Sequence, residues 1–154
     1  MPLNSTAPQP TTHLLYLHGF RSSPQSTKAQ HMARWMTREF PHVTWWCPQL
    51  PPSPQAAAAL IAQGTADWPA HSMAIMGSSL GGFYATWLAA QRGCRAVLIN
   101  PAIDPARDLA RYIGDQTAWH DPNEHFYFAP EFVEALRALY VGALPHPERL
   151  LAFI

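Results

Sequence analysis

The chain has 154 residues, of which 48% are hydrophobic and 13% charged, and ten basic and ten acidic residues give a formal net charge of zero. This length and composition predict one globular domain, residues 1–154, and exclude a disordered chain. The balanced charge argues against nucleic acid and anionic membrane surfaces as partners. The segment from Met1 to Thr12 lacks the features of a signal peptide, and no apolar run is long enough to span a bilayer, so we expect a cytoplasmic protein.

The first half of the chain alternates short apolar runs with segments of helical spacing. The apolar or β-branched runs predict buried strands over residues 14–17, 43–47 and 72–76. The segments between them predict helices over residues 24–40 and 56–62. Ser23 is the expected N-cap of the first helix, because Pro24 suits the first helical position.

The second half continues this alternation. Helices are expected from Tyr84 to Arg92, from Pro105 to Ile113 and from Pro130 to Tyr140, and strands over residues 95–99 and 149–154. Residues 115–128 follow neither period and are rich in aromatic side chains. We therefore expect this segment to be an irregular, lid-like loop over a site.

Strands that alternate with helices predict an α/β fold, with a doubly wound, mostly parallel sheet and helices on both faces. In such sheets ligands bind beyond the carboxyl ends of the strands. The sequence His18-Gly19-Phe20, the residue Ser79 and the pair Asn100-Pro101 each follow a predicted strand. These three places are therefore expected at one edge of the sheet.

The motif Gly77-Ser78-Ser79-Leu80-Gly81 follows an apolar strand and precedes a helix-forming run. In that context G-x-S-x-G predicts a nucleophile elbow, in which Ser79 stands on a sharp turn. Gly77 and Gly81 would remove the side chains that clash in such a turn. The N-terminus of the following helix would then favour negative charge beside Ser79. The alternative is an ordinary loop rich in glycine and serine.

At His18-Gly19-Phe20 and the elbow the chain resembles an α/β-hydrolase, and residues 14–24, 48–52 and 77–88 are similar to the small YqiA-type bacterial esterases. The resemblance implies that Ser79 is the nucleophile and that the backbone N–H groups of Phe20 and Leu80 form the oxyanion hole. It also implies that His18 and Gly19 shape the oxyanion loop. The use of His18 as the base is the alternative, which the order of the triad disfavours.

The order of the triad on this fold is serine, then acid, then histidine. The resemblance places the acid just after the strand at residues 149–154 and the histidine later still. We therefore expect that the sequence is truncated at its C-terminus, lacks its last strand and helix, and lacks the catalytic Asp and His.

Residues inside the chain offer alternative partners for Ser79. Asp104 follows the fourth strand, where some hydrolases of this fold carry their acid, but it is also the expected N-cap before Pro105. His120 and His125 lie beside acidic residues in the aromatic segment. Their spacing matches no metal-binding motif, so no metal site is predicted, and catalytic use of either histidine stays an alternative.

These observations predict a serine esterase that cleaves small carboxylic esters or thioesters through an acyl-enzyme on Ser79 and uses no cofactor. The expected partner is a small acyl-ester substrate, and the sequence assigns no oligomeric state. The alternative is a catalytically silent binding or partner module of the same fold. Cys47 and Cys94 are far apart in the sequence and are expected to be free thiols.

Overall fold

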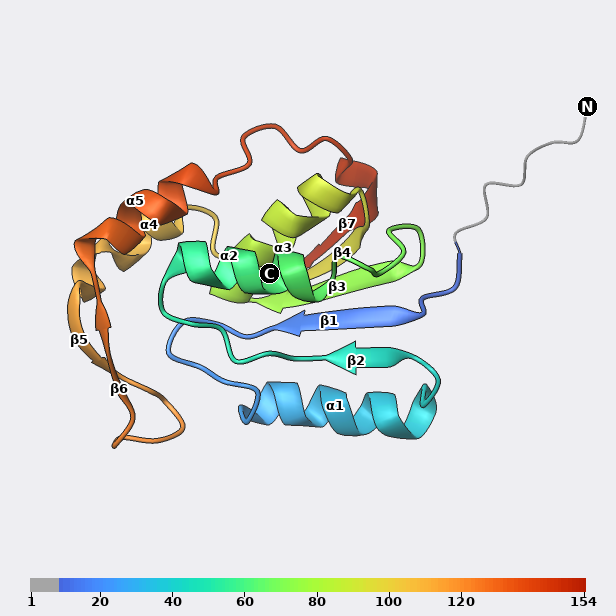
Figure 1. The fold of residues 1–154 in the computed structure, drawn as a ribbon, viewed down its shortest axis with the longest axis horizontal. Helices are drawn as coiled ribbons and strands as arrows, with labels where there is room; N and C mark the ends of the chain where they lie inside the picture. Colours follow the sequence, from blue (N-terminus) through green and yellow to red (C-terminus); the bar gives the residue numbers. More distant parts are fainter. Residues whose placement is uncertain (1–8) are drawn as a thin grey trace, which may run out of the picture.

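The computed structural model describes residues 9–154 as a parallel sheet with helices on both of its faces (Figure 1). The sheet has five strands in the order β2-β1-β3-β4-β7, and every neighbouring pair is parallel. Its strands are β1 (His13–Leu17), β2 (Thr44–Trp46), β3 (Met73–Ser78), β4 (Arg95–Ile99) and β7 (Leu150–Phe153). The predicted doubly wound α/β fold is confirmed.

The strand order reverses between β1 and β3. From β1 the chain moves outward to β2 and then returns to β3 on the other side of β1. In the register of this pair Leu17 lies beside Gly77, so His18 and the elbow leave the sheet side by side. Such a reversal is the place where open α/β sheets bind their ligands.

Helices cover the two faces of the sheet unequally. Figure 1 shows α1 (Thr27–Glu39) on one side and α2 (Pro54–Gly64) and α3 (Leu80–Arg92) on the other. The shorter α4 (Pro105–Leu109) packs with α5 (Pro130–Ala138) beyond the ends of the strands. Two short 3-10 helices, η1 (Ala110–Tyr112) and η2 (Pro147–Arg149), lie in the second half of the chain.

The first helix begins later than its sequence predicts. Ser26 is its N-cap, because the Oγ atom of Ser26 accepts a hydrogen bond from the N–H of Ala29 at 3.3 Å. Ser23 instead caps the preceding turn, where its Oγ atom accepts from the N–H of Gln25 at 3.0 Å. The expectation that Ser23 caps the helix was therefore wrong, since a turn and a helix start share the same Ser-Pro signal. The second Ser-Pro pair does start a helix, at Pro54.

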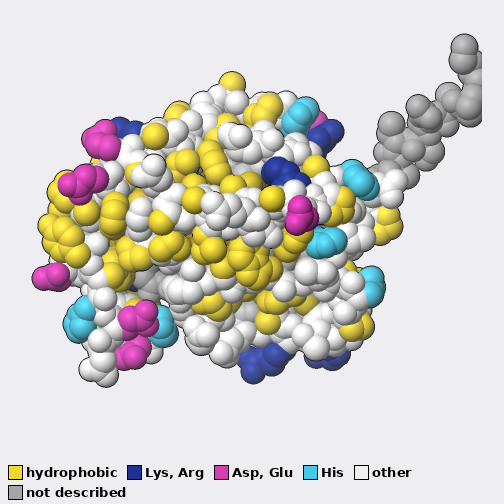
Figure 2. Space-filling view, viewed as in Figure 1, with side chains coloured by type: hydrophobic (Ala, Val, Ile, Leu, Met, Phe, Trp, Pro, Cys, Tyr) yellow, Lys and Arg dark blue, Asp and Glu magenta, His cyan; other side chains and the backbone are white. Residues whose placement is uncertain are grey.

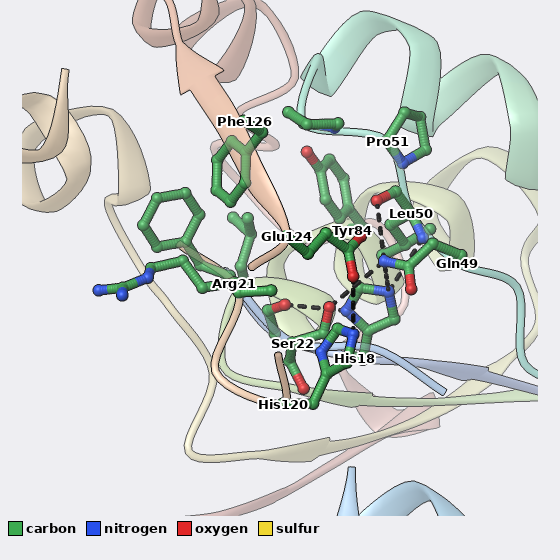
Figure 3. A pocket seen from close by; sticks show the side chains of 15 residues that line it. His18, Arg21, Ser22, Gln49, Leu50, Pro51, Tyr84, His120, Glu124 and Phe126 are labelled. Carbon is green, nitrogen blue, oxygen red and sulfur yellow. Dashed lines mark hydrogen bonds and ion pairs between the residues drawn. The ribbon is translucent and has the colours of Figure 1, made fainter. Parts of the chain in front are cut away.

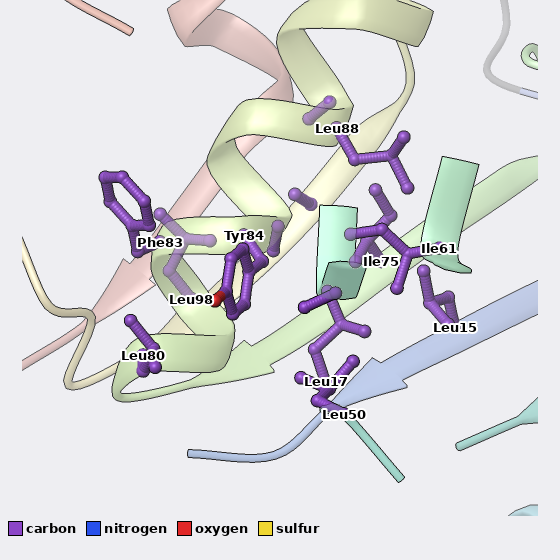
Figure 4. Packing of buried hydrophobic residues seen from close by; sticks show 14 of the residues in the cluster. Leu15, Leu17, Leu50, Ile61, Ile75, Leu80, Phe83, Tyr84, Leu88 and Leu98 are labelled. Carbon is purple, nitrogen blue, oxygen red and sulfur yellow. The ribbon is translucent and has the colours of Figure 1, made fainter. Parts of the chain in front are cut away.

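The main core lies between the sheet and the two helices α2 and α3. Figure 4 shows Leu15 and Ile75 from adjacent strands packed toward Ile61 of α2 and Leu88 of α3, and all four side chains are at most 1% exposed. Alternate strand residues point to the same face, so the buried runs in the sequence supply this core directly. This packing fixes the position of α3 and of the elbow from which it starts.

The aromatic segment is not irregular. Gly114–Thr117 (β5) and His125–Phe128 (β6) form an antiparallel hairpin, with Thr117 beside His125 near its turn. The expected irregular loop over residues 115–128 is corrected here, because both strands of the hairpin are only four residues long and carry no clear alternation of apolar and polar side chains. The hairpin contributes to the cavity described below.

Three smaller expectations concern the ends of the chain, the membrane and the cysteines. The segment from Met1 to Thr12 falls mostly on residues 1–8, which lie outside the described residues. Across residues 9–154 no helix combines the length and the hydropathy of a membrane span. Cys94 is buried and Cys47 is half-buried, and both are free thiols.

Candidate active site

Ser79 occupies the turn between β3 and α3 in a backbone conformation that few residues other than glycine adopt. Its φ is 54° and its ψ is −118°, and its side chain is exposed at the N-terminus of α3. The backbone holds this strained turn from both sides, because the N–H of Ser79 donates to the carbonyl of Ile99 at 3.0 Å and its own carbonyl accepts from Ala102 at 2.9 Å. Strain of this kind concentrates at functional sites.

The glycines of the motif allow the strand and the helix to approach each other closely. A Cβ atom on Gly77 would overlap the backbone of Gly81, and a Cβ atom on Gly81 would overlap the carbonyl of Leu17. Neither glycine has a positive φ, so the requirement is space and not backbone conformation. These contacts bring the N-terminus of α3 against the end of β1.

The loop after β1 therefore lies directly beside Ser79. A Cβ atom built on Gly19 would lie 3.7 Å from the Oγ atom of Ser79. In residues 9–154 the N–H groups of Phe20 and Leu80 donate to no recorded acceptor, and Leu80 is the first residue of α3, where no intrahelical acceptor exists. The N–H of Leu80 therefore adjoins the serine directly, and that of Phe20 follows Gly19 in the loop beside it.

His18 is buried, and both of its ring nitrogens are occupied. Its Nδ1 atom lies 2.9 Å from the carbonyl oxygen of Gly19, which can only accept, so Nδ1 carries the proton. Its Nε2 atom accepts a hydrogen bond from the N–H of Leu50 at 2.9 Å. Burial lowers the pKa of His18 further than the hydrogen bond to Gly19 raises it, and the nearby His120 adds to the lowering. His18 is therefore a neutral, fixed part of the loop.

The side chain of Phe20 attaches this loop to the hairpin. Its ring centroid lies 5.5 Å from that of Tyr112, 5.8 Å from that of Phe126 and 5.2 Å from that of Phe128. Aromatic rings at such centroid distances attract one another in tilted and edge-to-face arrangements. The backbone of Phe20 beside Ser79 is thus held in place by its own ring.

A cavity of about 260 Å³ opens beside this loop (Figure 3). It lies between the loop after β1, the proline-rich loop before α2, the first turns of α3 and the hairpin. Its lining residues include His18, Gly19, Phe20, Leu50, Pro51, Leu80, Tyr84 and Phe126. Because Gly19 and Leu80 also adjoin Ser79, the serine stands at the edge of this cavity.

The tip of the hairpin supplies a polar rim to the cavity. The Nε2 atom of His120 lies 2.9 Å from an oxygen of Glu124, and both residues line the cavity. Arg21 holds the hairpin from the other side, because its Nε atom donates to the carbonyl of Thr117 at 2.6 Å and its guanidinium group lies 3.8 Å from the centre of the Trp119 ring. The hairpin thus lines the cavity, and the expectation that the aromatic segment lies over a site stays a prediction.

The acidic side chains are unevenly distributed over the molecule. On the face shown in Figure 2 they lie mainly at the end of the molecule that carries α5 and the hairpin. Within residues 9–154 no three His, Cys, Asp or Glu side chains are arranged to hold a metal ion. Asp104 is the N-cap of α4, where its carboxylate accepts from the N–H of Arg107 at 3.3 Å, and His125 is exposed on β6.

Several residues of the cavity carry no sequence signal of their own. Tyr84 falls within a predicted helix, Arg21 lies in the loop after the predicted strand at residues 14–17, and Gln49 lies in a proline-rich loop. Lys28, on α1, donates to the buried Oγ atom of Ser78 at 3.0 Å and so supports the strand end before the nucleophile position. Only the packing of separate loops brings these side chains to one site.

Two solved structures show the same fold. One is the mouse α/β-hydrolase domain-containing protein 10, with a TM-score of 0.61 and 12% identity over 85% of this chain. The other is described with LipS and LipT, two metagenome-derived lipolytic enzymes, and has a TM-score of 0.56 and 19% identity over 84% of this chain. The match spans 62% of the mouse protein and 67% of the lipolytic enzyme.

At these sequence identities the similarity to the two solved structures establishes the fold alone. The family of the chain is established by a match to a protein-family model. An uncharacterised protein family, UPF0227, matches residues 13–154. This match confirms the expected resemblance to the YqiA-type proteins, and the two solved structures confirm the α/β-hydrolase fold. The chain belongs to the UPF0227 family.

Proposed function

We propose that the protein is a serine hydrolase that cleaves small carboxylic esters or thioesters through an acyl-enzyme on Ser79. The observation that carries the proposal is the exposed side chain of Ser79 on a strained turn with two free backbone N–H groups beside it. In this mechanism the Oγ atom attacks the carbonyl carbon, its proton passes to a base, and the alcohol or thiol leaves. Water then hydrolyses the acyl-serine ester.

The N–H groups of Phe20 and Leu80 are the proposed oxyanion donors. Their fixed position would stabilise the charge that develops on the carbonyl oxygen, and loss of one such donor costs about 3 kcal/mol of barrier. His18 and Gly19 support this role, because the hydrogen bonds of His18 fix the loop and Gly19 lets it approach Ser79. The apolar walls of the cavity favour an uncharged acyl group.

The mechanism needs a general base, and His18 cannot serve, since both of its nitrogens are engaged. His120 lines the cavity and contacts Glu124, but this pair follows the serine in the order histidine, then acid. The triads of this fold have the opposite order. We therefore propose that His120 and Glu124 hold the hairpin and shape the rim without acting as the base.

Hydrolysis of p-nitrophenyl acetate tests this proposal. We expect the purified protein to accelerate release of p-nitrophenol and the variant Ser79→Ala to reduce the rate to the level that the oxyanion hole and binding alone support. Equal rates for the two proteins would overturn the proposal.

One observation favours a second candidate, a catalytically silent binding module. In residues 9–154 the Oγ atom of Ser79 has no recorded hydrogen bond to a histidine or to any other group. Under this second candidate the cavity would bind a small acyl compound without turnover. Binding of an ester that the protein never hydrolyses, with Ser79 unreactive, would favour the module over the enzyme.

A further inference from the structure

Tyr84 presents a hydroxyl group to the cavity. It lies on α3, five residues after Ser79, and its side chain is only 1% exposed. Tyr84 lines the cavity, and Figure 3 shows its ring between Phe126 and Leu50. Within the described residues, 9–154, no hydrogen bond joins this hydroxyl to another group of the protein, and no fully buried side-chain oxygen lacks a partner, so the hydroxyl is open to the cavity.

A hydroxyl that faces a cavity and bonds no protein group makes that cavity selective for the ligand it admits. Water in the cavity can satisfy the hydroxyl while no ligand is bound, and an all-carbon ligand would displace that water without replacing its hydrogen bond. Burial raises the pKa of Tyr84 well above its ordinary value, so the phenol keeps its proton and can donate it. A ligand that offers an oxygen acceptor would remove the penalty.

Most of the other polar side chains that line the cavity are already paired. The ring of His18 bonds the loop backbone, and the Nε2 atom of Gln49 lies 3.3 Å from the carbonyl of Ser22. The walls contributed by Leu50, Pro51 and Phe126 are apolar. The cavity therefore suits a short carbon chain with one oxygen at the position of the Tyr84 hydroxyl.

The cavity lies to one side of Ser79. Tyr84 is among the residues that line it, whereas Ser79 is not. The oxygen that Tyr84 would bind is then held inside the cavity, along the acyl chain, and is not the carbonyl that Ser79 would attack.

We propose that Tyr84 is a specificity-determining residue whose hydroxyl donates a hydrogen bond to an oxygen in the acyl chain, so that the site selects esters of oxo acids over esters of hydrocarbon acids of the same shape. This inference rests on the proposed function, because it takes the cavity beside Ser79 as the acyl site. It goes further by naming the chemical class of the acyl group.

The test compares two esters of matched shape in the Ser79→Ala background, where binding is measured without turnover. The probes are methyl 4-oxopentanoate and methyl 4-methylpentanoate, whose dissociation constants are measured by isothermal titration calorimetry. We expect Tyr84→Phe to shift the ratio of the two constants by about five- to tenfold against the oxo ester, the value of one hydrogen bond. We expect little change in the affinity for 4-methylpentanoate ester, since its chain offers Tyr84 no acceptor.

Tyr16→Phe is the matched control. Tyr16 is also 1% exposed, but it lies on β1 and packs against Trp45, outside the cavity. We expect the ratio of the two dissociation constants in this variant to equal that in the parent protein. A ratio that Tyr84→Phe changes by less than about twofold, or a failure of the oxo ester to bind the parent, would overturn the inference.

The inference about Tyr84 and the proposed hydrolase function can fail independently of each other. Because both probes are tested without the serine nucleophile, the ratio does not depend on turnover. An altered ratio with an unreactive Ser79 in the wild-type protein would support the acyl specificity and refute the enzyme. A reactive Ser79 together with an unaltered ratio of dissociation constants would support the enzyme and refute the acyl specificity.

Discussion

The N–H of Leu50 donates a hydrogen bond of 2.9 Å to the Nε2 atom of His18 and so joins the proline-rich loop to the loop beside Ser79. The same ring bonds the carbonyl of Gly19 through Nδ1. One buried imidazole therefore fixes two walls of the cavity and the approach to the serine. It can do this only as the neutral tautomer, because the protonated ring could not accept from Leu50.

This arrangement predicts that the protein loses stability in mild acid. The folded state holds the pKa of His18 below its ordinary value, chiefly through burial, so the unfolded state binds the extra proton first as the pH falls. Stability rises with pH wherever the unfolded state binds more protons. We expect the free energy of unfolding in urea to decrease as the pH is lowered from about 7 to about 5, through the ordinary pKa near 6.5.

The variant His18→Gln provides the control for this pH dependence. Glutamine retains hydrogen-bonding groups but does not titrate, so the slope of stability against pH should become shallower even though the variant is less stable at neutral pH. If the wild-type protein and His18→Gln lose stability in parallel between these pH values, His18 is not the group responsible.

Substitution of Gly81 by alanine is expected to be severely destabilising. The new Cβ atom would overlap the carbonyl of Leu17, which belongs to β1, a strand paired on both sides, and cannot move freely. We expect a loss of more than about 3 kcal/mol, measured as a large fall in the midpoint of thermal unfolding or as loss of folded protein.

Gly142→Ala is the matched control for Gly81→Ala. A Cβ atom on Gly142 would meet nothing within 4 Å, and its backbone is not in the left-handed region. This substitution should change stability by less than about 1 kcal/mol, and in the stabilising direction if the unfolded chain loses freedom. Equal effects of the two substitutions would contradict the close contact between α3 and β1.

A His120→Gln variant is expected to keep Ser79 reactive. The pair with Glu124 is half-exposed, so its loss should cost under about 1 kcal/mol of stability and should affect the hairpin alone. We expect the rate of ester hydrolysis to fall by less than about tenfold, because a missing general base would cost far more. A fall of a thousandfold or more would instead assign the base to His120.

The sequence predicted the sheet well because its inner strands, β1, β3 and β4, are apolar runs bounded by glycines and prolines. It located Ser79 because a strand, a glycine-rich turn and a helix occur together there, a context that fixes the meaning of G-x-S-x-G. It misplaced the start of α1 at Ser23, because serine before proline also caps a turn. Local patterns therefore placed the elements but not always their ends.

The cavity could not be predicted in the same way. Tyr84, Gln49 and Glu124 come from a helix, a loop and a hairpin, and only the tertiary packing brings them together. The hairpin itself was missed because its strands are short and its aromatic side chains face different ways: Phe128 is buried and Tyr127 is exposed. A tyrosine within a predicted helix indicates a core residue. The ring of Tyr84 is indeed buried in the core, but this residue also lines the cavity.

The central claim, that Ser79 is an activated nucleophile, is tested most directly by reaction with a fluorophosphonate and identification of the modified residue by mass spectrometry. We predict one adduct, on Ser79, which is absent from Ser79→Ala and retained in Ser78→Ala, since the side chain of Ser78 is buried and bonded to Lys28. No adduct on the wild-type protein, or an adduct that persists in Ser79→Ala, would contradict the claim and favour a binding module.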